Sequence, residues 1–206
     1  MIMKKMISLL VLILSVGTSF VYAQEGKAEK QSKVLIAFFS HTGENYGVGN
    51  IEKGNTHIVA EMIAGETGGE LFEIATVKAY PKTYKACVDV AKQEKESSAR
   101  PELKADAAVE DFDMIFLGYP NWWGDMPMAV YTFIEKHNWQ GKTVIPFCTH
   151  EGSGLSSTEQ SIGKSCKGST VLKGLAVQGK TAQNEQEQAR KAVKTWLGKI
   201  NIQEKK

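Results

Sequence analysis

The feature that most constrains the fold of this chain is a short apolar run followed by a loop rich in hydroxyl groups and glycine. The run covers residues 34–39 and is continuous, as expected of a strand that is buried on both faces. Residues 40–43 form the loop, and after an intervening segment the apolar residues of 58–63 recur at helical spacing. The order strand, loop, helix is therefore predicted at the start of the domain.

This loop has the composition of an anion site. Asn55 stands where the N-cap of the helix is expected, and Thr56 adds a hydroxyl in its first turn. Backbone N–H groups at a helix start point outward, and the helix dipole favours negative charge. Ser40 and Thr42 are common turn residues in any loop, but beside this helix start they predict a phosphate cradle. His41 has two open interpretations, contact with the phosphate and exposure to solvent.

Residues 1–23 have the pattern of a signal peptide. Lys4 and Lys5 precede an uncharged apolar stretch, and residues 21–23 offer small side chains at the cleavage positions. An uncleaved membrane anchor is the alternative, because no further charge occurs before Glu25. We expect an exported protein, periplasmic or extracellular, in which residues 24–32 are a polar tether.

Residues 33–200 have the length of one domain, and residues 201–206 are expected to form a tail. The chain has 25 basic and 23 acidic residues, two of the basic ones in the signal segment, so no nucleic-acid partner is expected. Cys87, Cys148 and Cys166 are too few for a disulfide scaffold, although one pair could form after export.

Apolar strand patterns alternate with helical patterns along the whole domain. Strands are expected at residues 34–39, 70–77, 114–118, 143–148 and 170–177, and later helices at 83–98, 128–134, 161–167 and 184–197. This alternation predicts one parallel sheet with helices on both faces. Ligands of such sheets bind beyond the carboxyl ends of the strands. The loops after the first, third and fourth strands lie there, and all three have unusual compositions.

The second of these loops, residues 120–127, contains two adjacent tryptophans. Trp122 and Trp123 cannot both point into the same core from a loop with proline and glycine, so at least one is expected to line a cleft. An indole is suited to stacking on a flat ring system. The third loop, residues 149–157, contains Gly152 and Gly154, which allow backbone N–H groups to approach a ligand.

Together the three loops resemble those of the flavodoxin-like family, in the branch whose phosphate loop is of the Ser-x-Thr-Gly-Asn-Thr type. The resemblance implies an α/β doubly wound three-layer sandwich with a five-stranded parallel sheet of order 2-1-3-4-5. It also implies flavin mononucleotide (FMN) as cofactor, with its phosphate on the first loop and its isoalloxazine ring between the other two. The cofactor-binding residues that it implies are Ser40, His41, Thr42, Gly43, Asn55, Thr56, Pro120, Asn121, Trp122, Trp123, Gly124, Thr149, His150, Glu151, Gly152 and Gly154.

The resemblance gives two of the loops a more specific role. Trp123-Gly124-Asp125 is similar to the segment in which flavodoxins turn a peptide carbonyl toward flavin N5, and glycine permits that rotation because it tolerates positive φ. His150 and Glu151 are then expected at the ring edge, where their charge would act on the flavin.

The chain departs from the family pattern at residues 44–54, which separate Gly43 from Asn55. If the helix began at residue 44, Gly47, Gly49 and Gly54 would lie inside it, each at a cost of about 1 kcal/mol relative to alanine. We therefore expect an inserted excursion, either a flap over the site or a surface bulge.

Two other chemistries have weaker support in the sequence. A nucleophile–base pair of Cys148 and His150 lacks a third group to orient it. Among the histidines only His137 and His150 have ligand spacing, and they are expected on different elements. No catalytic or metal residue is therefore assigned. The expected function is electron transfer with a redox protein or a small-molecule donor or acceptor. An FMN-dependent NAD(P)H or quinone-type oxidoreductase and a binding module without redox activity are the alternatives, and no G-x-G-x-x-G fingerprint supports the former.

Overall fold

The structure is a computed structural model that describes residues 32–202. The predicted signal peptide, nearly all of the predicted tether and most of the predicted tail lie outside the described residues. Within residues 32–202, none of the helices combines the length and the apolar character that a membrane crossing needs.

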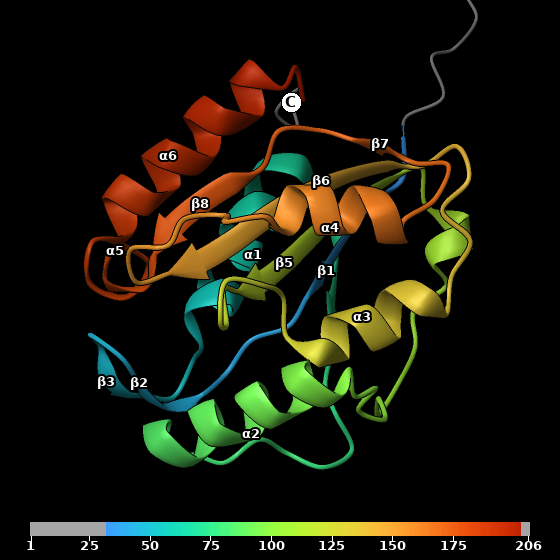
Figure 1. The fold of residues 1–206 in the computed structure, drawn as a ribbon. Coiled ribbons are helices and arrows are strands. Elements are labelled where there is room, and N and C mark those ends of the chain that lie inside the picture. The colour runs from blue at the N-terminus through green and yellow to red at the C-terminus, as the bar shows by residue number, and fades with distance from the viewer. Residues whose placement is uncertain (1–31, 203–206) are drawn as a thin grey trace, which may run out of the picture. The chain divides into compact units, whose positions relative to one another are not determined.

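A parallel sheet forms the centre of the domain (Figure 1). Its strands run in the order β4-β1-β5-β6-β7, and β8 also pairs with β6. Counted as five strands along the chain, this is the predicted order 2-1-3-4-5. The strands are β1 (Val34–Phe38), β4 (Glu70–Glu73), β5 (Met114–Pro120), β6 (Thr143–His150), β7 (Thr170–Val171) and β8 (Leu175–Gln178).

Helices cover both faces of the sheet (Figure 1). One core cluster joins Leu35 and Ala37 of β1 to α3 and α4, and the other joins Ile36 and Phe38 to α1, α5 and α6. Because successive residues of β1 enter opposite clusters, its continuous apolar run is explained by burial on both sides. The helices are α1 (Asn55–Thr67), α2 (Tyr84–Ser97), α3 (Met128–Glu135), α4 (Thr158–Ser165), α5 (Gly179–Asn184) and α6 (Gln186–Lys199), with a 3-10 turn η1 (Val109–Asp111).

Several element boundaries differ from the sequence prediction. The second strand ends at Glu73 rather than at residue 77, because Thr76 pairs with Leu103 in an antiparallel bridge that leads the chain away. The fifth strand is divided into β7 and β8, where the Gly174 N–H donates to a carboxylate oxygen of Glu159 at 2.8 Å. The closing helix predicted at residues 184–197 corresponds to α6, which is shifted by two residues, and the short helix α5 before it was not predicted.

The inserted residues form a small antiparallel hairpin of β2 (Gly43–Asn45) and β3 (Gly49–Ile51). Gly47 and Gly49, with φ of 75° and 74°, allow the tight reversal between the two strands. Gly43 faces Ile51 across the pair, so the insertion leaves and rejoins the domain at one place. Figure 1 shows the hairpin beside the N-terminal end of α2.

All three cysteines are buried free thiols, so the disulfide that the sequence left open is not formed.

Candidate cofactor site

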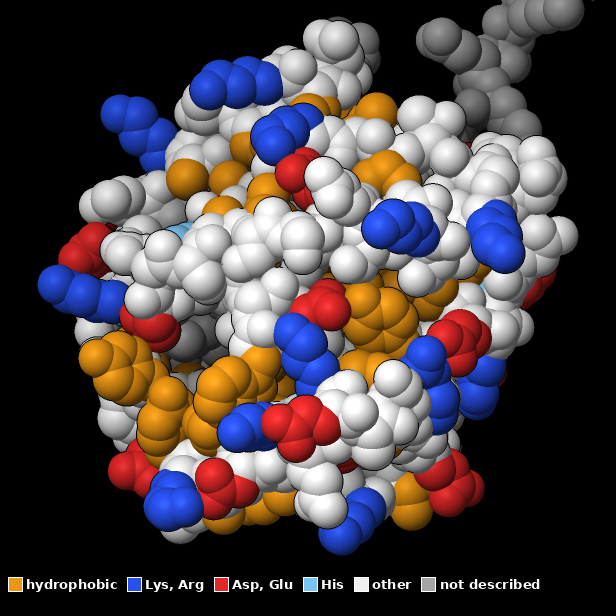
Figure 2. Space-filling view, viewed as in Figure 1, with side chains coloured by type: hydrophobic (Ala, Val, Ile, Leu, Met, Phe, Trp, Pro, Cys, Tyr) orange, Lys and Arg blue, Asp and Glu red, His pale blue; other side chains and the backbone are white. Residues whose placement is uncertain are grey.

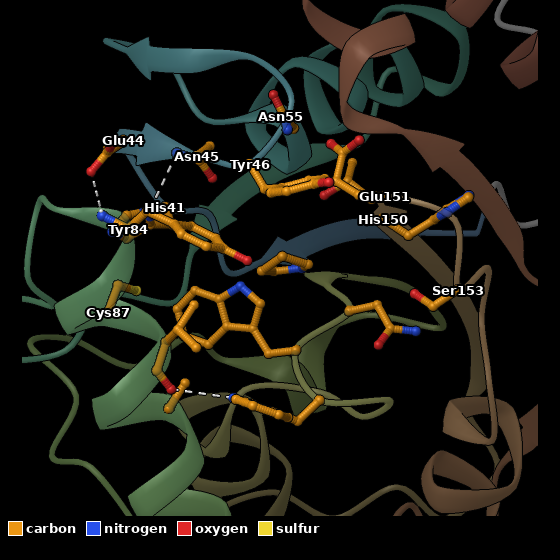
Figure 3. A pocket seen from close by; sticks show the side chains of 17 residues that line it. His41, Glu44, Asn45, Tyr46, Asn55, Tyr84, Cys87, His150, Glu151 and Ser153 are labelled. Carbon is orange, nitrogen blue, oxygen red and sulfur yellow. Dashed lines mark hydrogen bonds between the residues drawn. The ribbon is translucent and has the colours of Figure 1, made fainter.

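The three predicted loops meet at the carboxyl edge of the sheet and enclose a cavity of about 320 Å³ (Figure 3). Its lining contains nine of the residues predicted from the sequence: His41, Asn55, Pro120, Asn121, Trp122, Trp123, Thr149, His150 and Glu151. The other predicted residues lie in the same loops but outside the lining: Ser40, Thr42, Gly43, Thr56, Gly124, Gly152 and Gly154. Their contact with a cofactor remains a prediction.

The start of α1 is built by residues that are distant in the chain. Gly54 is the N-cap and Asn55 the first helical residue, so the predicted cap is displaced by one position. The role of a capping side chain is taken by Ser40, whose Oγ accepts from the His57 N–H at 3.1 Å. A Cβ on Gly54 would stand 2.2 Å from that oxygen and 2.5 Å from the His41 carbonyl oxygen, so only glycine allows this close approach.

The hydroxyls predicted for the cradle have partners within the protein. Thr56 Oγ1 shares a hydrogen bond with Thr149 Oγ1, and both side chains are buried. The Lys82 ammonium group donates to Thr42 Oγ1, which places a positive charge beside the first loop. Asn55 is different, because its Oδ1 is buried at the pocket and has no partner among the described residues.

His41 is held between the hairpin and the segment before α2. Its Nε2 donates to the Pro81 carbonyl oxygen at 2.9 Å, and its Nδ1 accepts from Asn45 Nδ2 at 3.3 Å. These bonds require the tautomer with the proton on Nε2. The two bonds hold His41 at the pocket wall, and its contact with a phosphate stays a prediction.

The second loop contains a tight turn centred on Trp123 and Gly124. Trp122 and Asp125 exchange backbone hydrogen bonds of 2.9 and 3.1 Å, and the two central residues have φ of 55° and 76°. Positive φ at both central positions is the signature of a type I′ turn. The family resemblance tied the freedom of Gly124 to a cofactor-dependent rotation, whereas here the turn already requires it in the protein alone.

The two tryptophans are held in different ways. Trp122 packs in an aromatic cluster, with ring centroids 5.3 Å from Phe39 and 5.2 Å from Tyr80. Trp123 is half exposed and is fixed to α2, because its Nε1 donates to the Val88 carbonyl oxygen at 3.2 Å. Both line the pocket, as the sequence argument required of at least one of them.

The third loop is fixed through Asn121, which reaches across from the end of β5. Its Nδ2 donates to the Gly154 carbonyl oxygen at 2.8 Å and to Ser156 Oγ at 2.9 Å. Its Oδ1 is buried without a partner among the described residues. A second orphan acceptor is therefore present at the pocket lining.

Cys148 and His150, at the end of β6, do not form a nucleophile and its base. Burial raises the pKa of Cys148 to about 12, so the thiol stays protonated at neutral pH. His150 Nδ1 accepts from the Gly152 N–H at 2.9 Å, and burial lowers the pKa of the imidazole. The arrangement favours a neutral His150 and an inert Cys148.

One wall of the pocket was not predicted from the sequence. Glu44, Asn45 and Tyr46 of the hairpin, four residues of α2 (Tyr84, Cys87, Val88 and Ala91) and Ser153 complete the lining. Figure 2 shows hydrophobic side chains gathered beside a hollow over the hairpin and α2. Tyr46 and Tyr84 are 63% and 41% exposed, and their rings are neighbours. The sequence alone gives no sign that these two exposed side chains lie together. The insertion thus contributes to the site rather than bulging away from it.

The hairpin is attached to α2 by a carboxylate. One oxygen of Glu44 accepts from the Tyr84 N–H at 2.8 Å, and the Glu44 N–H donates to the Lys82 carbonyl oxygen at 2.7 Å. Thr83, the N-cap of α2, makes no capping bond with its own side chain. Glu44 therefore caps α2 from another part of the chain.

Residues 32–202 contain no group of three or more His, Cys, Asp or Glu side chains that could hold a metal ion.

A doubly wound parallel sheet, with a helix start, a tryptophan-bearing loop and a glycine-rich loop around a pocket at its carboxyl edge, is the architecture of the flavodoxin class. The chain belongs to the flavodoxin family, whose model matches residues 33–200. No curated protein sequence matches the chain significantly.

Solved structures agree with this assignment. A protein from Bacteroides eggerthii described as a flavoprotein is 28% identical, with a TM-score of 0.65, and the match covers 84% of this chain and 99% of that one. A similar protein from Bacteroides uniformis is 29% identical, with a TM-score of 0.66 and coverage of 82% and 99%. A Lactobacillus acidophilus flavoprotein in complex with FMN shares the fold at 20% identity and a TM-score of 0.55, with coverage of 75% and 97%.

Proposed function

We propose that this protein binds FMN noncovalently in the pocket and transfers electrons through it. The observation that carries the proposal is the pair of buried orphan acceptors, Asn55 Oδ1 and Asn121 Oδ1, at the lining of a pocket between three loops. Buried acceptors are normally paired. The hydroxyl and N–H groups of a flavin nucleotide are suitable donors, so the residues present fit this cofactor.

The chain's own groups divide into a phosphate end and a ring end. At the phosphate end, α1 offers the backbone N–H groups of Asn55 and Thr56 and the Asn55 side chain, and Lys82 adds a nearby positive charge. At the ring end, Trp122 and Trp123 offer aromatic surface, and residues 149–154 offer backbone N–H groups. The cofactor, when bound, supplies the redox chemistry, while the protein orients it and limits its contact with water.

The relatives support this proposal. The Lactobacillus acidophilus protein carries FMN in its structure, and the two Bacteroides proteins are described as flavoproteins and are matched over nearly their whole length. The partner would be a redox protein or a small-molecule donor or acceptor. The signal-peptide pattern of residues 1–23 supports an exported site of action.

The decisive experiment uses the protein purified from the envelope of an expressing bacterium. We expect a yellow protein with a flavin absorption spectrum, and after removal of the flavin we expect it to rebind FMN at a ratio of one to one. Anaerobic reduction followed by a redox dye then tests electron transfer. Absence of FMN binding would overturn the proposal. Binding without reversible reduction would favour the binding module, and steady NAD(P)H consumption with a quinone would favour the oxidoreductase.

The same sample tests export. We propose cleavage after Ala23, so intact-mass measurement is expected to give a chain that begins at Gln24. A full-length protein that needs detergent for extraction would instead favour the anchor.

A further inference from the structure

The carboxylate of Glu151 lies beside the start of α1, at the proposed phosphate end of the pocket. A Cβ placed on Gly179 would stand 2.2 Å from Glu151 Oε1 and also 2.2 Å from Asn55 Nδ2, so the carboxylate and the first residue of α1 are neighbours. Figure 3 shows Glu151 beneath Asn55, with Tyr46 of the hairpin beside it. The protein thus holds its own anion next to the helix start that is proposed to receive the phosphate.

Backbone from two other elements fixes this position. The Gly179 N–H hydrogen-bonds the Glu151 carboxylate from the start of α5. A Cβ on Gly47, in the turn of the hairpin, would meet Glu151 Oε2 at 3.2 Å. Glu151 as a whole is exposed, but its carboxylate lies between the turn of the hairpin and the start of α5, and the partial loss of solvent there raises its pKa. The Gly179 hydrogen bond partly opposes that rise.

The charged groups on the surrounding elements have other partners. Lys180 of α5 lies 3.8 Å from Glu185, and Lys53, which follows the hairpin, lies 2.7 Å from Glu61. On α1, His57 is 3.4 Å from the same Glu61.

The remaining neighbours are the phenol of Tyr46 and the imidazole of His150, whose pKa is lowered by burial. Within residues 32–202, Glu151 forms no salt bridge with a basic side chain.

We propose that Glu151 sets the selectivity of the pocket for the phosphate group, because its ionised carboxylate competes with the phosphate for the start of α1. This inference rests on the proposed binding of FMN. Two like charges a few ångströms apart repel, and each disfavours ionisation of the other. FMN must therefore displace the carboxylate or bind beside its protonated form. Riboflavin, which lacks the phosphate, does not meet this repulsion.

The test compares FMN with riboflavin in the wild type, in Glu151→Gln and in the control Glu187→Gln. Glu187 is exposed in the first turn of α6 and does not line the pocket, so its change removes the same charge elsewhere. Dissociation constants are measured by flavin fluorescence between pH 5.5 and pH 8. At pH 8 we expect Glu151→Gln to bind FMN about tenfold more tightly than the wild type, a difference of about 1.4 kcal/mol. Riboflavin affinity is expected to stay within about twofold, on the same scale.

The pH profile adds an independent readout. As the pH falls, the wild-type affinity for FMN is expected to approach that of Glu151→Gln, because the carboxyl becomes neutral. The second ionisation of the free phosphate monoester, near pH 6, is common to both titrations and cancels in their ratio. The ratio of their affinities therefore isolates Glu151.

The outcomes are distinguishable. If Glu151→Gln weakens FMN and riboflavin equally, Glu151 binds the ring or the ribityl chain and the inference is overturned. Unchanged FMN affinity at every pH overturns it as well, and leaves the proposed function standing. If neither the wild type nor the variants bind FMN, the proposed function fails and this inference with it.

Discussion

The hydroxyls of Thr56 and Thr149 lie 2.8 Å apart and share a buried hydrogen bond. This contact joins the first turn of α1 to the end of β6, so two of the three loops around the pocket are fixed to each other. The pairing gives Thr56 a structural partner, in competition with the phosphate contact that the family resemblance implies.

A double-mutant cycle tests this pairing. Thr56→Val and Thr149→Val are each expected to lower the free energy of unfolding by about 1–2 kcal/mol, because each leaves a buried hydroxyl without its partner. The double variant is expected to lose less unfolding free energy than the sum of the two single losses, since it leaves no buried hydroxyl without a partner. Urea denaturation measures all four proteins. Additive costs would show that the two hydroxyls do not interact.

The turn at Gly124 predicts that replacing this glycine lowers the stability of the protein even without a cofactor. With φ of 76° at this residue, Gly124→Ala is expected to lower the unfolding free energy by about 1 kcal/mol through backbone strain. Nothing within 4 Å would meet the added methyl, so crowding does not contribute. Gly163→Ala in α4 is the matched control. An added methyl at Gly163 also has no neighbour within 4 Å, but the backbone there is helical, so the change is expected to leave the free energy of unfolding unchanged or to raise it.

The hydrogen bond between Glu44 and the start of α2 predicts that removing the carboxylate destabilises both the hairpin and the first turn of α2. Glu44→Ala is expected to cost about 1 kcal/mol, the usual scale for a lost helix cap, and to speed amide exchange in the first turn of α2 and in the hairpin. Glu52→Ala, at an exposed position just after β3, is the control. If amide exchange becomes faster only in the hairpin, Glu44 does not stabilise the first turn of α2.

Glu94 predicts a pH-dependent difference in stability. Its carboxylate accepts from the Tyr80 hydroxyl at 2.6 Å, and burial raises its pKa, although the Tyr80 bond and Lys78 oppose the rise. The folded state therefore binds the proton more tightly than the unfolded state, in which the pKa is about 4.3. The stability from this proton is fully present below that pH and is lost as the pH rises through the folded pKa.

The measurement compares the melting temperature of Glu94→Gln with that of the wild type. The glutamine amide keeps an acceptor for Tyr80 but carries no charge. The melting temperature of Glu94→Gln relative to that of the wild type is therefore expected to increase from pH 4 to pH 7. Glu96→Gln, exposed on the same helix, is the control for overall charge. A pH-independent difference would contradict the assigned direction of the pKa.

The apolar runs of the central strands predicted the parallel sheet, because both core clusters draw on them. The order of the strands was implied by the resemblance to the flavodoxin-like family and not by those runs. It also located the three loops, whose residue types differ from ordinary connections. The wall formed by the hairpin and α2 was not predicted, because Glu44 and Tyr84 are 40 residues apart and each alone has the pattern of a surface residue. The direction of the Glu151 side chain was also not predictable, since it depends on the approach of Gly179.

The pairing of Gly43 with Ile51 means that the insertion begins and ends at neighbouring points of the domain. A segment of this kind can be lengthened without altering the distance that its flanking elements must span. Its turn, through Gly47, touches the loop that follows β6. A fluorescent reporter grafted into residues 46–48 would therefore sit directly over the cofactor pocket and would convert its filling into an optical signal.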